Sequence, residues 1–255
     1  MQFNHNLLPK ILILYLLLFL GGINLMIAQA PLRKSPYEWS YAADIPTSTI
    51  GIGANVAYII LDKKLPGLSP AEILSLDRNQ VNSFDRSATY NWNPKAALAS
   101  DILLYSSMAL PAILLADADI RKDYLKVGSI YLQTLALNTG ITNLTKVLVH
   151  RNRPYMYNPE APMDLKLKND ARYSFFSGHT SVSAAMCFMT AKIYSDYHPD
   201  SKALPYIWAG AAIIPATTAL LRWEAGKHYW SDVIVGYITG AAIGFLVPHL
   251  HKIVR

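Results

Sequence analysis

A histidine, an aspartate and an arginine lie close together in the stretch LRWEAGKHYWSD at positions 221–232. His228 and Asp232 are four residues apart, so they share a face if a helix begins there. A carboxylate within hydrogen-bond reach fixes the tautomer of an imidazole and supports its positive charge, as a nucleophilic or basic histidine requires. Arg222 adds a planar cation suited to an oxyanion such as phosphate. By itself, this spacing is more typical of a capped helix start that carries surface charges.

Two earlier stretches supply the groups that these three residues lack. In KVLVHRNRP, Lys146 is followed seven residues later by Arg153, which precedes a proline. In SFFSGHTS, Ser177, Gly178 and His179 form a short run of small and polar residues. The three stretches together contain cations for phosphoryl oxygens, small residues with free amides, a general acid and a nucleophile. This set of groups is complete for phosphoryl transfer.

The three stretches resemble the tripartite motif of the type-2 phosphatidic acid phosphatase superfamily, which also contains class A bacterial acid phosphatases and vanadium haloperoxidases. The family pattern is Lys-x6-Arg-Pro, then Pro-Ser-Gly-His, then Ser-Arg-x5-His-x3-Asp. Every charged or nucleophilic position of that pattern is present here, in the same order and at the same spacing. The departures are Phe176, where proline is usual, and Leu221, where serine is usual. We expect them to affect substrate positioning more than activity.

The resemblance implies a role for each motif residue. His228 is expected to attack phosphorus and form a phosphohistidine, while Asp232 holds the other ring nitrogen. His179 is the expected general acid, which protonates the leaving group and then activates water. The remaining motif residues are expected to bind the phosphoryl oxygens: Lys146, Arg153, Arg222, Ser177 and Gly178.

Local chemistry predicts further details around the motifs. Ser177 is also a suitable N-cap for a following helix, and Pro154 is expected to end the preceding helix and so hold Arg153 at its end. Contact with substrate is a secondary hypothesis for His150 and Arg151, which occupy variable motif positions. Three charged residues near the polar stretch at 62–95 are expected to form structural ion pairs, with substrate contact as the lesser alternative: Asp85, Arg86 and Asp101.

No cofactor is expected. The histidines and carboxylates outside the motifs show no spacing typical of metal ligands, and the family resemblance implies catalysis without a metal. The basic residues are scattered, which disfavours nucleic acid as a partner. The net charge of +6 instead suits an anionic substrate or an anionic lipid surface.

Composition predicts one large helical domain at residues 31–255. Of the 255 residues, 52% are hydrophobic and only 16% are charged, against roughly 25% charged in soluble domains. Strand signals are scarce, and a polar stretch contains an amphipathic portion at about 71–84 that is expected to form a short surface helix. The expected fold class is an all-α bundle of about six helices, embedded in a membrane. The apolar helical segments lie at 45–61, 97–116, 124–149, 178–197, 203–221 and 231–249.

Residues 1–30 predict a secretory signal, because Lys10 precedes a continuous apolar run that ends at Ala28-Gln29-Ala30. An uncleaved anchor helix is the alternative. The six segments are borderline in length for membrane spans, so a large soluble bundle stays open. If all six cross, the three motifs lie on one side and Pro31 lies on the other. This conflicts with a cleaved signal combined with an outward-facing site, so one of these premises must fail.

The leading hypothesis is a metal-independent phosphatase that hydrolyses a phosphomonoester or pyrophosphate of a cell-envelope lipid through a phosphohistidine. Abundant apolar helix and aromatic residues beside the motifs favour a lipid substrate. The expected location is the inner membrane with a periplasm-facing site, or the periplasm. The alternatives are a soluble periplasmic acid phosphatase of broad specificity, a vanadate-dependent haloperoxidase and a non-catalytic membrane scaffold. The sequence does not indicate which lipid is bound or which oligomer forms.

Overall fold

A computed structural model describes residues 34–62 and 67–253 of the protein. Within these ranges the regular structure is helical, apart from an isolated antiparallel bridge between Tyr37 and Lys252. Residues 1–30, which we expected to form a signal or an anchor, lie outside the described residues.

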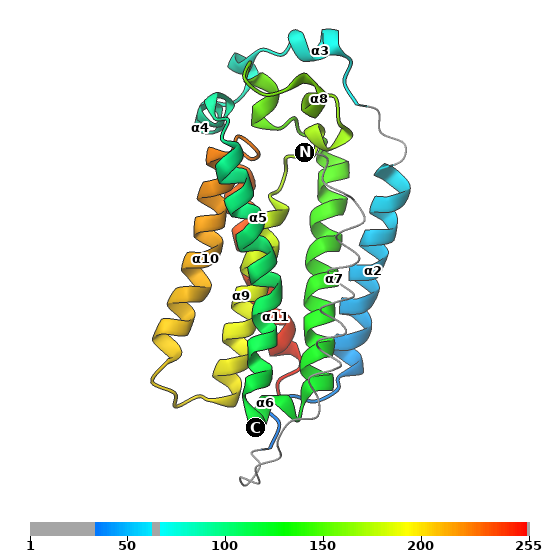
Figure 1. Cartoon of the computed structure of the whole chain (residues 1–255). Helices are drawn as coiled ribbons and strands as arrows, with labels where there is room; N and C mark the ends of the chain where they lie inside the picture. Colours follow the sequence, from blue (N-terminus) through cyan, green and yellow to red (C-terminus); the bar gives the residue numbers. More distant parts are fainter. Residues whose placement is uncertain (1–33, 63–66, 254–255) are drawn as a thin grey trace.

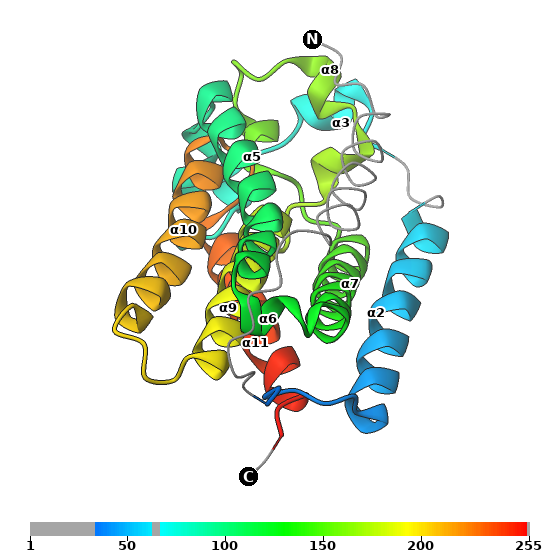
Figure 2. The same cartoon turned by 60° about the horizontal axis from the view of Figure 1, so that its bottom comes forward.

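Six long helices form the body of the molecule (Figures 1 and 2). The sequence therefore predicted the all-α class and the number of long helices correctly. The third and fourth long helices have the expected bounds. The other four extend a few residues beyond the expected segments, although the fifth also starts one residue later than expected. The long elements are α2 (Tyr41–Asp62), α5 (Pro94–Ala109) with its continuation η4 (Leu110–Ala116), α7 (Tyr124–Val149), α9 (Gly178–Tyr197), α10 (Leu204–Glu224) and α11 (Trp230–Leu250).

Helix α9 forms the centre of the bundle. Most of its residues are buried, and it packs against α11, α10, α7 and α5. Helix α2 lies on the outer side of α7 (Figure 1). The central position of α9 means that a group at its first turn is surrounded by the ends of several other helices.

Glycines allow α11 to lie directly on α9. A Cβ atom at Gly240 would lie 2.0 Å from the carbonyl oxygen of Ser181, a distance that no side chain tolerates. Gly51 has the same role between α2 and α7, where a Cβ atom would lie 2.8 Å from backbone. Gly53, in contrast, faces open space. The α11 contact is made by the glycine stripe, namely Gly236, Gly240 and Gly244.

Short elements cover one end of the bundle, at the top of Figure 1. The prediction of a single surface helix at 71–84 was wrong. The segment is broken because Asp77 and Asn82 each accept a backbone hydrogen bond and so start a new turn. The short elements are α3 (Pro70–Leu74), η2 (Arg78–Gln80), α4 (Ser83–Arg86), η3 (Ser87–Tyr90), α6 (Ala118–Arg121), η5 (Pro154–Tyr157), α8 (Met163–Lys166) and η6 (Asn169–Arg172), of which α6 lies at the opposite end.

Three of the long helical segments are long and apolar enough to cross a membrane. Large apolar side chains also remain exposed along the sides of α2, α5, α10 and α11. Apolar exposure on this scale is unusual for a protein surrounded by water. The candidate spans are Pro94–Ala116, Leu204–Glu224 and Trp230–Leu250.

Candidate active site

The direction of the helices brings the three motifs together. The last turns of α7 and α10 and the first turns of α9 and α11 lie at the same end of the bundle, below the short elements (Figure 1). This is the common placement that the sequence predicted. The charges of Arg153, Arg222, Lys146 and His179 all act on His228, so residues from all three motifs share one site.

Helix α7 ends at the expected residue, but not through the expected proline. Its last residue is Val149, and His150 adopts the left-handed conformation with φ of 54°, a common way to end a helix. The prediction that Pro154 ends the helix was therefore wrong. Arg153 instead lies in an extended segment before η5, where its backbone N–H donates to the carbonyl oxygen of Ala171 at 2.8 Å. This bond holds Arg153 beneath the covering elements.

The guanidinium of Arg153 is fixed on all sides. Nε and Nη2 donate to the backbone and side chain of Asp170, both at 2.8 Å. Nη1 lies 3.2 Å from the carbonyl oxygen of Lys227 and 3.2 Å from Nε2 of His228. Because a guanidinium only donates, Nε2 of His228 must accept. Arg153 is thus a rigid cation directly beside the reactive atom of the histidine.

The tautomer of His228 follows from its other nitrogen. Nδ1 lies 2.8 Å from the carbonyl oxygen of Ser174, and a carbonyl oxygen only accepts, so Nδ1 carries the proton. Nε2 therefore has a free lone pair. Burial, reinforced by the charges of Arg153 and Arg222, lowers the pKa of His228 well below its ordinary value. The imidazole is neutral at pH 7, which is the state that a nucleophile requires.

Asp232 lies beside His228, but it is not the closest acceptor for the ring. Its Oδ2 is 3.5 Å from Nδ1, farther than the Ser174 carbonyl. Oδ2 accepts from the backbone N–H of Tyr229 at 2.9 Å and from the Ser174 hydroxyl. Helix α11 begins after His228, so the expected shared helical face was also wrong. Asp232 caps the helix and places a negative charge near the ring.

Arg151 and Asp85 belong to the site, although the sequence gave them only secondary roles. Arg151 Nη1 donates to Asp232 at 2.6 Å, and Nη2 donates to Asp85 at 2.7 Å. The guanidinium also lies 3.9 Å above the ring of Tyr229. Asp85 in turn accepts from the backbone N–H and hydroxyl of Ser231. Arg151 therefore links the covering element α4 to the start of α11.

The general-acid candidate His179 pairs with Asp101. Its Nε2 donates to Asp101 Oδ1 at 2.7 Å, and Nη1 of Arg222 reaches the same oxygen at 3.4 Å. Burial and the charge of Arg222 lower the pKa of His179, while Asp101 opposes this shift. Asp101 is thus an ion-pair residue, as expected, and it lies within the site. Arg86 forms no ion pair with the described residues, so that expectation was wrong; it donates to the carbonyl oxygens of Val81 and Asn79.

The start of α9 supplies a place for an anion. Ser177 caps the helix, since its hydroxyl accepts from the backbone N–H of Thr180 at 3.4 Å, as predicted. A Cβ atom at Gly178 would lie 3.5 Å from Nζ of Lys146, so the ammonium lies at the helix N-terminus, where anions are stabilised. Nε of Arg222 is buried and has no hydrogen-bond partner among the described residues. These donors fit a bound phosphoryl group.

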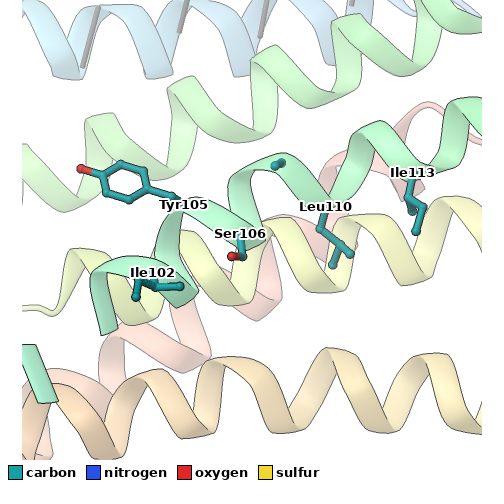
Figure 3. Close-up of a pocket in the computed structure, with 6 residues that line it drawn as sticks. Ile102, Tyr105, Ser106, Leu110 and Ile113 are labelled. Atoms are coloured by element: carbon teal, nitrogen blue, oxygen red, sulfur yellow. The ribbon is translucent and has the colours of Figure 1, made fainter. Parts of the chain in front are cut away.

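A shallow apolar groove runs along the outer side of α5 and η4 (Figure 3). Tyr105, one of its lining residues, lies one helical turn after Asp101. The groove therefore begins next to the site and leads along the apolar side of the bundle. Its lining residues are Ile102, Tyr105, Ser106, Ala109, Leu110 and Ile113.

A family model matches the part of the chain that contains the three motifs. Residues 128–254 match the family model of the PAP2 superfamily, the superfamily of type-2 phosphatidic acid phosphatases, and this region of the chain belongs to it. The matched region contains all three motifs.

Curated relatives and a solved structure also match. An 81-residue segment is 35% identical to phospholipid phosphatase 1 of Rattus norvegicus and 37% identical to that of Mus musculus. In both cases the segment spans 31% of this chain but only 29% of the relative. The crystal structure of a transmembrane PAP2-type phosphatidylglycerolphosphate phosphatase from Bacillus subtilis matches with a TM-score of 0.48 and 21% identity. That match covers 79% of this chain and 96% of the other.

Proposed function

We propose that the protein is a phosphatase that transfers a phosphoryl group from a lipid phosphate to His228 and then to water. The observation that supports this most strongly is the state of the imidazole. Nδ1 is held by the Ser174 carbonyl, and the free lone pair of Nε2 lies among the cations of the three motifs. A buried neutral histidine that faces three cations has little structural purpose, but it suits attack on an anion.

In the first step, Nε2 of His228 forms a bond to phosphorus while the bond from phosphorus to the leaving oxygen breaks. His179, as the imidazolium paired with Asp101 in the substrate complex, donates a proton to that oxygen and becomes neutral. Lys146, Arg153 and Arg222 neutralise the charge spread over the phosphoryl oxygens. In the second step His179 takes a proton from water, the water oxygen bonds to phosphorus, and the bond to nitrogen breaks. Inorganic phosphate leaves and the imidazole returns to its neutral form.

We propose a lipid as the substrate and the cell envelope as the location. The exposed apolar sides of the bundle and its candidate spans favour a membrane over the soluble alternative. The groove on α5 offers a surface for an apolar chain whose phosphate is bound by the motif cations. The curated relatives are named phospholipid phosphatases, in agreement with this class of substrate. Residues 31–255 then form one membrane domain, with a site that faces the periplasm.

The test is phosphate release by the purified protein from a lipid pyrophosphate and from a soluble aryl phosphate, each with and without chelator. The proposal expects turnover that resists the chelator, prefers the lipid and disappears in His228→Ala. Equal or faster turnover of the aryl phosphate would instead support the soluble acid phosphatase. Undiminished turnover in His228→Ala would reject the nucleophile.

A further inference from the structure

Two polar groups beside the motif residues have no polar partner within the described chain. Tyr155 is fully buried, and its hydroxyl makes no hydrogen bond. The ammonium of Lys227 lies 4.7 Å from the centre of the Tyr155 ring and 5.6 Å from that of Trp92. It forms no ion pair with a carboxylate of the described residues. A buried hydroxyl and a half-buried ammonium without partners are costly unless a ligand satisfies them.

The backbone holds both groups next to the nucleophile. The N–H of Tyr155 donates to the carbonyl oxygen of Gly226 at 2.9 Å, and Arg153 donates to the carbonyl oxygen of Lys227 at 3.2 Å. These two bonds join the segment before His228 to the start of η5. The positions of Tyr155 and Lys227 relative to the reacting nitrogen are therefore fixed.

Lys227 adds a fourth cation to the three of the motifs. Burial and the charges of Arg153 and Arg222 lower the pKa of Lys227 to about 8, while the carboxylates of Asp170 and Asp101 oppose this shift, so Lys227 stays mostly charged at pH 7. Burial raises the pKa of Tyr155 to about 12, so its hydroxyl remains a donor. Three motif cations already match the charge of one phosphoryl group. A fourth cation beside them calls for a second anionic group.

The second group lies on the leaving-group side of the site. The charge of Lys227 acts on Asp101, the carboxylate that holds the general-acid candidate His179. A group that receives its proton from His179 is thus within the electrostatic reach of Lys227. In a monoester this leaving group is an alcohol, which carries no charge. In a diphosphate ester it is a phosphate.

We propose that Lys227 and Tyr155 bind the leaving phosphate of a diphosphate ester, so that the site selects lipid diphosphates over lipid monophosphates. This inference rests on the phosphatase activity proposed above. His228 attacks the terminal phosphorus, and the bond from that phosphorus to the bridging oxygen breaks. The lipid monophosphate leaves with the electron pair and takes a proton from His179. Lys227 and the Tyr155 hydroxyl donate hydrogen bonds to its non-bridging oxygens.

The two substrates that test this are farnesyl diphosphate and farnesyl monophosphate, because they share one apolar chain and differ by one phosphate. The measurement is kcat/KM for each in the same detergent micelles. Wild type should prefer the diphosphate. Lys227→Met should lose about 10- to 100-fold on the diphosphate, the range for a charge-assisted hydrogen bond, and far less on the monophosphate. Tyr155→Phe should also lose kcat/KM mainly on the diphosphate, but by a smaller factor.

Three controls separate recognition from folding. Lys227→Arg keeps the charge and should recover most of the activity on the diphosphate. Lys95→Met and Tyr90→Phe change exposed residues at the same end of the molecule. Neither variant should change kcat/KM for either substrate. Thermal unfolding of each variant checks that the fold is kept.

Equal losses on both substrates in Lys227→Met would overturn the inference, and so would a wild-type preference for the monophosphate. In either case the proposed phosphatase activity would stand, because wild type would still release phosphate and His228→Ala would not. Failure of wild type on both substrates would reject the phosphatase proposal itself, and the inference with it.

Discussion

Nδ1 of His228 donates a hydrogen bond to the backbone carbonyl oxygen of Ser174 at 2.8 Å. A backbone group thus fixes the tautomer of the proposed nucleophile, while the carboxylate of Asp232 lies at 3.5 Å and acts mainly through its charge. A side chain could be lost by mutation, but this carbonyl cannot. The orientation of the ring is therefore separate from the electrostatic support that Asp232 gives to the imidazolium.

This separation predicts a moderate effect of Asp232→Asn. Where a carboxylate alone fixes the tautomer of a catalytic histidine, its amide variant loses about 10⁴-fold in kcat. Here the Ser174 carbonyl remains, so we expect a loss of about 10- to 100-fold, from reduced charge support for the imidazolium. The measurement is kcat of Asp232→Asn beside wild type and His228→Ala. A loss as large as that of His228→Ala would show that Asp232 is the direct partner of the ring.

Arg151 is expected to be a positioning residue. Arg151→Met leaves Asp232 and Asp85 without their shared cation, so we expect a loss of about 1–3 kcal/mol in unfolding free energy. Because Arg151 acts through Asp232, kcat should fall while KM changes little. Arg78→Met is the control, since Arg78 binds the carbonyl oxygen of Tyr157 on the same covering layer. A rise in KM with unchanged kcat would instead place Arg151 against the substrate.

The glycine stripe predicts a pair of opposite effects on stability. Gly240→Ala would force α11 away from α9, because its Cβ would lie 2.0 Å from the Ser181 carbonyl oxygen. We expect a loss of about 1–3 kcal/mol or more and reduced activity, since both helices carry motif residues. Gly53→Ala meets open space and should stabilise helix α2 by about 0.5–1 kcal/mol. Thermal unfolding of both variants in one detergent tests this. Equal shifts in Tm for Gly240→Ala and Gly53→Ala would contradict the close packing of α11 on α9.

Burial of neutral His228 predicts a loss of stability in acid. The folded-state pKa is lowered, whereas the unfolded chain takes up a proton near pH 6.5. Unfolding therefore binds a proton below that pH, and the contribution of His228 to stability falls as pH decreases. We expect the Tm of His228→Gln to fall less than that of wild type between about pH 7 and 5. If the Tm of wild type and that of His228→Gln fell equally over this pH range, the prediction would be contradicted. The charged and titratable groups that face His228 in both proteins are Arg153, Arg222, Lys146, His179 and Asp232.

Much of the architecture could be predicted from the sequence, because long apolar segments can only form buried or membrane-facing helices. The bounds of α7 and α9 followed from such patterns, as did the cap at Ser177. The segment at 71–84 was not predictable in the same way. Its apolar spacing favours one helix, but the side chains of Asp77 and Asn82 bind the backbone and divide it.

That the motif side chains share one site could be predicted from their spacing, but the groups that orient them could not. The Ser174 carbonyl is a backbone atom and has no residue type. Arg151 and Asp85 are 66 residues apart, so no local spacing connects them. The contact depends on how α4 folds over the start of α11, which only the tertiary structure specifies.

The most direct test of the central claim is to trap the phosphorylated enzyme. Brief incubation with a lipid substrate labelled at the terminal phosphate, followed by denaturation in alkali, should leave label on the protein. Phosphohistidine survives alkali and is lost in acid, so the label should disappear on acid treatment. Peptide mapping should place it at His228, and His228→Ala should carry none. Turnover by wild type without any trapped label, or label that persists in His228→Ala, would contradict the account.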